Sequence, residues 1–260
     1  IKFKAGIFTN FSQDHLDYHK NMKSYLNSKL VLFREILSKK SVIISDNEIK
    51  PFSLLKLIAL KKKQKLTNIK EEFEKIKSIS SESTSNFRIK NLAMAIEATR
   101  LCGLKEKLIY KTLKRLKDVS GRLELVRRFP NNIKVYVDYA HTPDALFQTL
   151  KFLKNKYGNN ISLVFGCGGD RDKKKRPLMA RIADDNCKKA FITDDNPRSE
   201  SPKKIRNELL KNFSKIEVLD IGNREFAIKT AIKNAGPHET ILIAGKGHEE
   251  QQIYKNKIKY

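Results

Sequence analysis

The strongest constraint on the fold is a regular alternation of short apolar runs and helix-forming stretches that begins near Ile133. The apolar runs are Ile133–Val137, Ile161–Phe165, Ala190–Thr193, Ile216–Leu219 and Thr240–Ala244. The stretches between them are typical of helices and cover Asp144–Lys156, Pro177–Asn186, Lys203–Phe213 and Glu225–Asn234. This order predicts a doubly wound α/β fold, in which helices cover both faces of a mostly parallel sheet.

Two of the predicted helices begin with the same pair of residue types. Thr142-Pro143 and Ser201-Pro202 each place a hydroxyl side chain directly before a proline. The hydroxyl can accept from a backbone N–H of the first turn, and proline fits the first helical position because it lacks an N–H. Both pairs therefore predict helix N-termini.

Polar segments follow four of the predicted strands. They are DYAHTPD from Asp138, GCGGDRD from Gly166, TDDNPR from Thr193 and AGKGHEE from Ala244. Each segment alone could be an ordinary strand-to-helix turn. Because parallel strands end at the same edge of a sheet, where ligands of such folds bind, the four segments together predict a binding site.

The first 121 residues show a less regular pattern. The spacing predicts helices over Met22–Leu37, Phe52–Leu60 and Lys90–Leu101, and a strand over Ser41–Ser45. The lysine- and serine-rich stretch Lys61–Ser85 predicts no element, and the region between Asp46 and Asn91 contains no convincing strand. We expect a domain boundary near Gly121, which gives domains at 1–121 and 122–260.

A candidate reactive residue lies in the helix predicted over Met22–Leu37. Lys29 falls within a stripe of apolar residues at helical spacing, which are Met22, Tyr25, Leu26, Leu30, Phe33, Ile36 and Leu37. Such a lysine either extends its ammonium to water or stays inside as a neutral amine, because burying the charge is costly. A neutral amine can react with carbon dioxide to give a carbamate, which could bind Mg²⁺ beside a histidine.

Net charge and cysteine content indicate which partners and which cellular compartment to expect. The formal net charge of +25 is compatible with a polyanionic partner. The lysines are spread over predicted helix faces, however, so small anionic substrates or a simple compositional bias explain the charge as well, and we expect no nucleic acid. The three cysteines form no CxxC pair, which favours a reducing, cytoplasmic location. No apolar run approaches the ~18 residues of a membrane span.

The glycine-rich segments do not form a known phosphate loop. Neither GCGGDRDKKKRP nor AGKGH fits the pattern GxxxxGK[ST]. If the protein uses a nucleoside triphosphate, we expect its phosphate loop outside this sequence, which starts at Ile1 without a methionine and looks like a fragment. Gly166, Gly168 and Gly169 are expected to let the backbone approach a ligand or to permit a tight turn.

Six segments together resemble the Mur ligase family, in the family's order. They are TNFSQDHLDYH, SGRLELV, VDYAHTPDAL, FGCGGDRDKKKRPLMA, TDDNPRSE and AGKGHEEQQI. The resemblance runs from about Thr9 to the end and is weak over Lys50–Ser85. It implies the C-terminal part of an α/β central ATP-binding domain, followed by a Rossmann-like domain that binds the added amino acid.

The resemblance also implies an activity. It is that of an acid–amino-acid ligase that converts ATP to ADP and adds meso-diaminopimelate to UDP-MurNAc-L-Ala-D-Glu in peptidoglycan synthesis. ATP would phosphorylate the D-glutamate side carboxylate, and the amine of diaminopimelate would then displace phosphate from the acyl phosphate. The implied partners are ATP, Mg²⁺, diaminopimelate and the UDP-MurNAc-dipeptide, with the protein acting as a monomer.

The resemblance assigns roles to individual residues. Lys29, as its carbamate, and His15 match the metal and catalytic positions. The positions that match nucleotide-binding residues are Asn91, Arg122, Asp138, Tyr139 and His141. The positions that match the diaminopimelate pocket are Arg171, Asp195, Asn196, Pro197, Arg198, Gly245 and Glu249. In this interpretation the arginines bind carboxylates, and Asp195, Asn196 and Glu249 accept from ammonium groups.

Some features depart from the family or leave alternatives open. The N-terminal uridine-binding domain and the P-loop half of the central domain are missing, and Arg88 stands where an asparagine often does. The fragment alone is therefore expected to be inactive. The alternatives are a Mur ligase that adds lysine, whose relatives lack an arginine at the Arg198 position, and a basic nucleic-acid-binding module.

Overall fold

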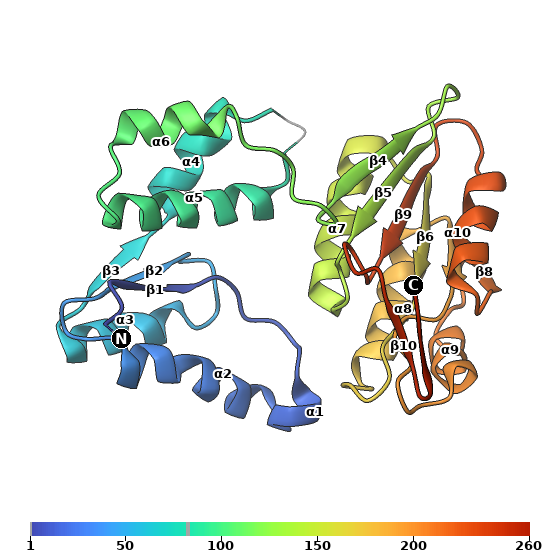
Figure 1. Ribbon diagram of the computed structural model, residues 1–260, viewed down its shortest axis with the longest axis horizontal. Coiled ribbons are helices and arrows are strands. Elements are labelled where there is room, and N and C mark those ends of the chain that lie inside the picture. Colours follow the sequence, from blue (N-terminus) through green and yellow to red (C-terminus); the bar gives the residue numbers. More distant parts are fainter. Residues whose placement is uncertain (1, 82–83) are drawn as a thin grey trace. The chain divides into compact units, whose positions relative to one another are not determined.

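The computed structural model describes residues 2–81 and 84–260, which form two compact units (Figure 1). The N-terminal unit comprises the residues up to Ser12 together with His19–Lys117. The C-terminal unit comprises Gln13–Tyr18 together with Asp118–Tyr260. Each unit contains a sheet with helices packed against it. The domain boundary expected at residue 121 stays a prediction.

The sheet of the C-terminal unit confirms the predicted fold class. Its strands are β4 (Glu124–Arg128), β5 (Lys134–Asp138), β6 (Ile161–Phe165), β7 (Lys189–Ile192), β8 (Glu217–Asp220) and β9 (Thr240–Ala244). Their spatial order is β4-β5-β9-β6-β7-β8. All neighbouring pairs in it are parallel except β4 and β5, so the sheet is mostly parallel as expected.

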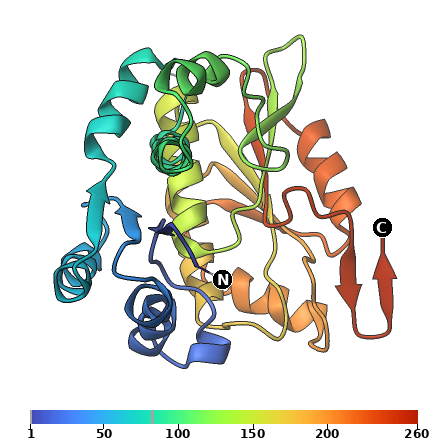
Figure 2. The same cartoon turned by 60° about the vertical axis from the view of Figure 1, so that its left-hand side comes forward.

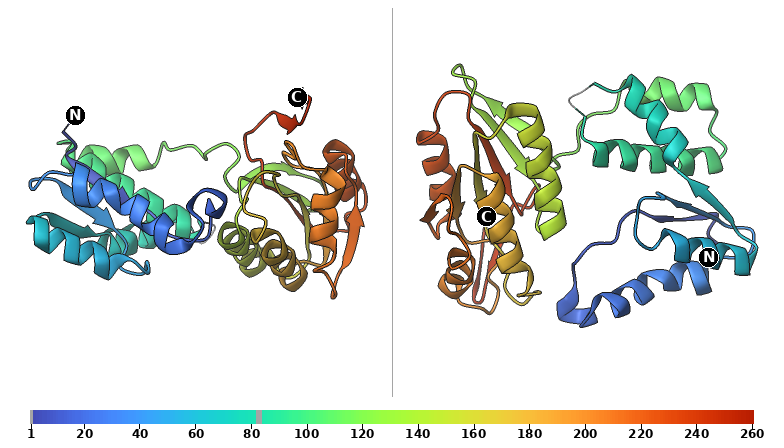
Figure 3. Two further views of the ribbon diagram at one scale, coloured as in Figure 1. Left: turned by 90° about the horizontal axis from the view of Figure 1, so that it is seen from below. Right: turned by 180° about the vertical axis from the view of Figure 1, so that it is seen from behind.

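Helices cover both faces of this sheet (Figures 1 and 3). They are α7 (Pro143–Tyr157), α8 (Lys175–Asn186), α9 (Pro202–Leu210) and α10 (Arg224–Lys233). Helix α8 packs between α7 and α9, whereas α10 packs on the face formed by Val135, Val164 and Ile241. Because both faces are covered, the central strands are mostly apolar, and β6 is buried at every position.

The two predicted helix starts have the expected composition. Thr142 caps α7, where its hydroxyl accepts from the backbone N–H of Ala145, and Pro143 is the first helical residue. Ser201 precedes α9 without a side-chain cap, and Pro202 again opens the helix. The N-terminal proline signal is therefore confirmed at both sites.

The sequence pattern missed the edge elements of the C-terminal unit. Strand β4 reads ELVRR, and all but one of its residues are exposed. The short strands β10 (Gln252–Tyr254) and β11 (Lys257–Lys259) form an antiparallel hairpin near the C-terminal end (Figure 2). Edge strands bury too little apolar surface to show an alternating pattern, and charged side chains protect them from further pairing.

The N-terminal unit contains a parallel sheet of order β1-β2-β3 with helices around it. Its strands are β1 (Ala5–Phe8), β2 (Val42–Ser45) and β3 (Lys65–Asn68). Its helices are α2 (Met22–Val31), η1 (Leu32–Ile36), α3 (Phe52–Lys62), α4 (Lys70–Ile79), α5 (Asn86–Leu101) and α6 (Glu106–Leu113), and the short α1 (Leu16–His19) precedes α2 at the unit border.

The expectation that the region between Asp46 and Asn91 lacks a strand is wrong. Strand β3 pairs with β2 from Lys65 to Asn68, and α4 follows it. The pattern failed because KLTN carries only one aliphatic residue and lies at the edge of its sheet. Residues 82 and 83 of the unassigned stretch lie outside the described residues.

The helix predicted over Met22–Leu37 forms, but its last turn is a π-helix. The backbone N–H of Leu37 donates to the carbonyl of Leu32 at 2.9 Å, which is an i to i+5 bond. This wider turn carries Leu37 into the core beside Phe33 and leaves Ile36 52% exposed. Ile36 therefore does not belong to the buried stripe.

No helix in the described part of the chain is both long enough and apolar enough to cross a membrane.

Candidate functional site

The four polar segments predicted to meet do leave the sheet at one edge. Strands β5, β9, β6 and β7 are parallel neighbours, so their carboxyl ends share an edge. Their backbones also approach one another closely. A Cβ on Gly166 would lie 2.1 Å from the carbonyl oxygen of Thr193, and one on Gly169 would lie 1.9 Å from that of Pro197. These glycines allow the loops after β6 and β7 to pack together.

An aromatic and basic cluster forms around Tyr139, directly after β5. The guanidinium carbon of Arg122 lies 4.2 Å from the centroid of the Tyr139 ring. The ring of His141 meets that of Tyr139 edge-on at 4.7 Å, and the ring of His248 stacks on it at 5.8 Å. The structure thus brings together three of the residues predicted to bind nucleotide and adds His248.

Asp138 holds the backbone of this cluster. Its carboxylate accepts from the backbone N–H groups of Leu123 at 2.6 Å and Ala140 at 2.8 Å, and from the hydroxyl of Thr149 at 3.3 Å. Burial raises the pKa of Asp138, and these hydrogen bonds offset part of the rise. Because protein donors already contact both of its oxygens, its geometry supports a role in orienting the segments around Arg122 and Tyr139.

A second cluster links the segments after β7 and β9. The ammonium of Lys246 donates to Oδ1 of Asn196 at 3.0 Å and to Oε2 of Glu249 at 2.9 Å. The Nδ2 of Asn196 also donates to Oε2 of Glu249, at 3.3 Å, and the hydroxyl of Tyr139 donates to Oε1 at 3.0 Å. Burial acts to raise the pKa of Glu249, but the bonds from Lys246, Tyr139 and Asn196 outweigh burial and lower the pKa.

This geometry changes the expected role of the Asn196 carbonyl. Its Oδ1 accepts from Lys246 and also from the backbone N–H of Ile253 at 2.9 Å. A carbonyl oxygen has two lone pairs, and both are therefore used inside the protein. The interpretation that Asn196 accepts from a substrate ammonium is not supported by this arrangement, whereas one N–H of its amide remains for a ligand.

Asp195 and Gly245 face each other across the edge. Asp195 Oδ1 accepts from the backbone N–H of Asn196 at 2.8 Å, whereas its Oδ2 is buried without a hydrogen-bond partner in the described residues. Gly245 has φ +109°, and a Cβ there would lie 2.9 Å from this Oδ2. A side chain at Gly245 would thus be strained and would also press on Asp195.

Arg198 is held by backbone oxygens and not by Glu200. Its Nη1 donates to the carbonyls of Gly169 at 2.9 Å and Asn196 at 3.3 Å. Its backbone has φ +52° and donates to the carbonyl of Ile253 at 2.9 Å. The guanidinium is half-buried and has no carboxylate within bonding distance among the described residues, so the structure supports its availability to an anionic group.

Other predicted site residues lie outside these two clusters. Arg171 is exposed, and its Nη1 donates to the carbonyl of Asp170 at 3.1 Å. Pro197 is buried between Asn196 and Arg198, where its carbonyl lies against Gly169. Asn91 is exposed on α5 of the N-terminal unit.

The predicted metal ligands belong to separate units. Lys29 lies half-buried on α2 of the N-terminal unit, and its Nζ lies 5.0 Å from the ring centroid of Tyr25 and 5.8 Å from that of Phe8. His15 belongs to the C-terminal unit, where its Nε2 lies 3.4 Å from Oδ2 of Asp14. No group of three or more His, Cys, Asp or Glu side chains in the described ranges is arranged to hold a metal ion. The pairing of Lys29 and His15 at Mg²⁺ stays a prediction.

Sequence reasoning missed three residues that shape this edge. Lys246 is only 6% exposed although it lies in a polar, glycine-flanked segment. Arg224 is buried at the start of α10 and donates to the carbonyl of Ala244 at 2.8 Å. Gln252 donates through Nε2 to the carbonyls of Asp194 and Asp195, both at 3.0 Å. The occurrence of Lys246 between two glycines was a signal, but only burial distinguishes it from a surface lysine.

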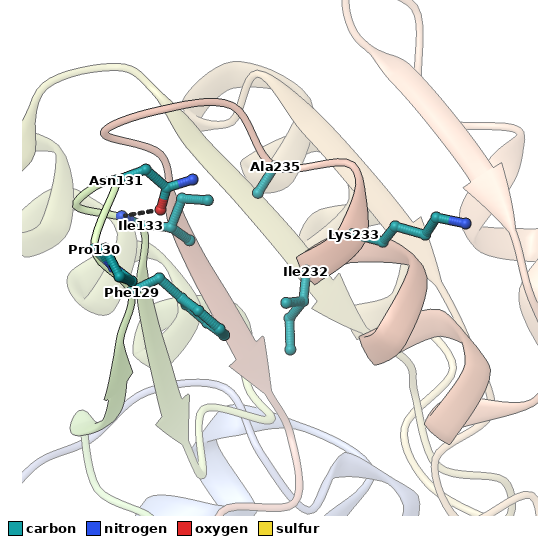
Figure 4. Close-up of a pocket in the computed structure, with 7 residues that line it drawn as sticks. All are labelled: Phe129, Pro130, Asn131, Ile133, Ile232, Lys233 and Ala235. Atoms are coloured by element: carbon teal, nitrogen blue, oxygen red, sulfur yellow. Dashed lines mark hydrogen bonds between the residues drawn. The ribbon is translucent and has the colours of Figure 1, made fainter.

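A hollow of about 410 Å³ lies at the other edge of this sheet (Figure 4). Its lining residues are Phe129, Pro130, Asn131, Ile133, Ile232, Lys233 and Ala235, from the β4–β5 turn and the end of α10. None of the predicted site residues lines it, so it does not contribute to the candidate site.

Comparisons with known proteins match two family models to consecutive parts of the chain. The model of the Mur ligase middle domain matches residues 1–103, and that of the Mur ligase glutamate ligase domain matches residues 121–247. Among solved structures, a bifunctional folylpolyglutamate synthase/dihydrofolate synthase from Yersinia pestis, complexed with AMPPNP and Mn ion, aligns with TM-score 0.71. It is 15% identical and covers 94% of this chain and 59% of that chain, so the likeness concerns the fold alone.

Curated relatives show a closer similarity in sequence. The UDP-N-acetylmuramoyl-L-alanyl-D-glutamate–2,6-diaminopimelate ligase of Rickettsia montanensis is 37% identical over 99% of this chain and 58% of its own length. The ligase of the same name from Wigglesworthia glossinidia brevipalpis is 39% identical over 99% of this chain and 57% of its own length. The chain thus spans somewhat more than half the length of these relatives. Two domain models of one family, in consecutive order along the sequence, and this level of identity show that the chain belongs to the Mur ligase family.

Proposed function

We propose that the full-length protein is a UDP-N-acetylmuramoyl-tripeptide synthetase. It adds meso-diaminopimelate to UDP-MurNAc-L-Ala-D-Glu and converts ATP to ADP, in peptidoglycan synthesis. The observation that carries this proposal is the carboxyl edge of the sheet, where Arg198, Asp195 and Glu249 supply charges of both signs. Diaminopimelate carries two ammonium and two carboxylate groups, so its pocket needs both. The names of the curated relatives support the same substrate.

The proposed pocket uses Arg198 and Arg171 for carboxylates and Glu249 for an ammonium group. Arginine suits the first role because its planar fork donates two parallel hydrogen bonds to a carboxylate. Oε1 of Glu249 accepts from Tyr139 and keeps a second lone pair for a substrate N–H. Gly245 and Asp195 form the opposite wall, and Asn196 and Pro197 shape the loop between them.

In the proposed reaction the protein positions groups and neutralises charge. The D-glutamate side carboxylate attacks the γ-phosphorus of ATP, and ADP leaves. The neutral amine of diaminopimelate then attacks the acyl carbon, phosphate leaves, and the amine loses a proton. The roles proposed for Arg122, Tyr139 and His141 are nucleotide contacts by stacking and charge, with Asp138 orienting their segments and Asn91 near the base.

A metal ion is part of the proposal. Mg²⁺ would neutralise phosphate charge, and Lys29, as its carbamate, with His15 would hold it. An unmodified ammonium cannot ligate a metal, so the fit depends on carbamylation of Lys29. Lys29 lies half-buried on α2, with its Nζ beside the rings of Tyr25 and Phe8.

We further propose that residues 1–121 are the C-terminal part of the central ATP-binding domain and that 122–260 form the amino-acid-binding domain. The matches of the two family models support this division. The same proposal has the full-length protein act as a cytoplasmic monomer, and the 260-residue chain inactive alone.

The decisive experiment uses the full-length protein with ATP, UDP-MurNAc-L-Ala-D-Glu and either meso-diaminopimelate or lysine. We expect mass spectrometry to show the diaminopimelate tripeptide with matching release of ADP and phosphate. Preferential incorporation of lysine would overturn the substrate assignment. Absence of any product, together with tight and salt-sensitive DNA binding, would instead favour the nucleic-acid-binding alternative.

A further inference from the structure

Lys246 is a buried cation inside the proposed amino-acid pocket. Its residue is 6% exposed, and it lies between Gly245 at φ +109° and Gly247 at φ +50°. Glycine adopts such positive φ values without steric cost, so the backbone can turn sharply on both sides of Lys246. Burying an ammonium is costly unless it is paired, so its partners indicate why it lies there.

The first partner of Lys246 is the Asn196 amide, whose orientation it determines. An ammonium and a backbone N–H can only donate, so the groups of Lys246 and Ile253 both require the carbonyl oxygen of Asn196. The opposite orientation would place the NH₂ group against two donors. The amide nitrogen therefore faces Glu249.

The second partner of Lys246 is one oxygen of Glu249. Oε2 accepts from Lys246 at 2.9 Å and from Asn196 at 3.3 Å, whereas Oε1 accepts from Tyr139 at 3.0 Å. Lys246 thus fixes the rotation of the carboxylate and leaves lone-pair capacity on Oε1. It also offsets the negative charge of Glu249.

We infer that Lys246 is a positioning residue of the amino-acid pocket. Its ammonium orients the Asn196 amide and the Glu249 carboxylate so that they receive a zwitterionic amino acid, and it does so through these residues and not by touching the reacting atoms. The inference rests on the proposed function, because it names the groups that meet diaminopimelate.

The test compares the full-length wild-type protein with Lys246→Met, which keeps the length of the side chain and removes its charge and donors. Lys204→Met, at an exposed position on α9, is the matched control. Lys246→Met should raise the KM for diaminopimelate on the order of tenfold and leave the KM for ATP within about twofold. Lys204→Met should change neither. An unchanged KM for diaminopimelate, or equal increases for both substrates, would overturn the inference.

A double-mutant cycle tests whether Lys246 affects the KM for diaminopimelate through Glu249. If Lys246 acts by holding Glu249, then Lys246→Met in a Glu249→Gln background should raise the KM for diaminopimelate by less than about threefold. Full additivity of the two substitutions would show that Lys246 does not act through Glu249.

Chemical rescue covers the case in which Lys246→Met fails to fold. Lys246→Ala leaves space for a small cation, so added propylammonium should lower the KM for diaminopimelate several-fold towards the wild-type value. Tetramethylammonium carries the same charge without N–H donors and should not rescue. Rescue by both cations or by neither would overturn the positioning role.

The same assays separate this inference from the proposed function. Wild-type turnover of diaminopimelate with an unaffected Lys246→Met variant refutes the inference alone. A wild-type protein that uses lysine refutes the substrate assignment, and the KM for lysine then decides the role of Lys246 in the same comparison.

Discussion

The buried Arg176 forms a bidentate ion pair with the partly exposed Glu200 beneath the loop that carries the proposed pocket. The side chain of Arg176 is 0% exposed, and its Nη1 and Nη2 donate to the two carboxylate oxygens of Glu200 at 3.1 and 2.8 Å. Glu200 also accepts from the backbone N–H of Asp170 at 2.7 Å. The pair therefore fixes the segment after β7 to both α8 and the segment after β6, and it leaves Arg198 for other partners.

This pair predicts an acid-sensitive part of the stability. The hydrogen bond from Arg176 is the main cause that lowers the pKa of Glu200 from 4.5 to about 2. Because the folded-state pKa is depressed, the contribution is fully present above pH ~4.5 and is lost as the pH falls towards ~2. Urea unfolding at a series of pH values should show this loss in the wild-type protein, and Glu200→Gln should lack that component. An identical pH dependence of the unfolding free energy in both proteins would contradict this prediction.

Removal of one partner should be more costly than removal of both. Arg176→Met leaves Glu200 without its main partner and should lower the unfolding free energy by about 1–3 kcal/mol. The double variant Arg176→Met with Glu200→Gln should recover part of that loss. Chemical denaturation measures the three values, and a double variant less stable than Arg176→Met would contradict this explanation.

Arg198→Ala should specifically impair use of diaminopimelate by the full-length protein. A forked arginine–carboxylate contact in a partly closed pocket contributes about 2–3 kcal/mol, so the KM should rise roughly 30- to 150-fold. Lysine has no second carboxylate, and its weak use should change little. Arg181→Ala, an exposed position on α8, is the control. Steady-state assays with both amino acids test this prediction. Equal increases in the KM for diaminopimelate and for lysine would show that Arg198 does not belong to the specificity pocket.

Gly245→Ala tests the wall formed with Asp195. Gly158→Ala is a matched control, because Gly158 also has positive φ, at +80°, but a Cβ there meets no atom within 4 Å. Both substitutions should cost about 1–3 kcal/mol of stability from backbone strain. Only Gly245→Ala, which brings a Cβ to 2.9 Å from Asp195 Oδ2, should also raise the KM for diaminopimelate. Similar KM values for the two variants would argue against a pocket at Gly245.

Lys29→Ala should strongly impair catalysis by the full-length protein if the carbamate holds Mg²⁺. Added acetate or formate should restore part of the activity, because a short carboxylate can replace the carbamate at the metal. Native mass spectrometry of the wild-type protein should show the added mass of one carbon dioxide, absent from Lys29→Ala. Unchanged activity of the variant would identify Lys29 as a packing residue of α2.

The sequence by itself determined the layered core of the C-terminal unit. Its strands and helices carry apolar patterns because each must bury a face against its neighbours. Helix-start signals such as Thr142-Pro143 mark where helices begin. The shared edge of the four polar segments followed from the same pattern, since parallel strands end together. Tyr139 and His141, predicted from the resemblance, follow β5 at this edge, and Arg122 joins them because β4 begins there antiparallel to β5.

Only the tertiary structure decided which polar side chains are already satisfied. Residue type does not distinguish Lys246 from Lys204, but tertiary contacts bury the first, whereas the second is exposed. The edge strands β3 and β4 likewise form because a neighbouring strand supplies hydrogen-bond partners, which local composition cannot reveal. Burial and pairing depend on residues far apart in the chain, and for this reason the partners of Asn196 and Glu200 were not predictable from their neighbours in sequence.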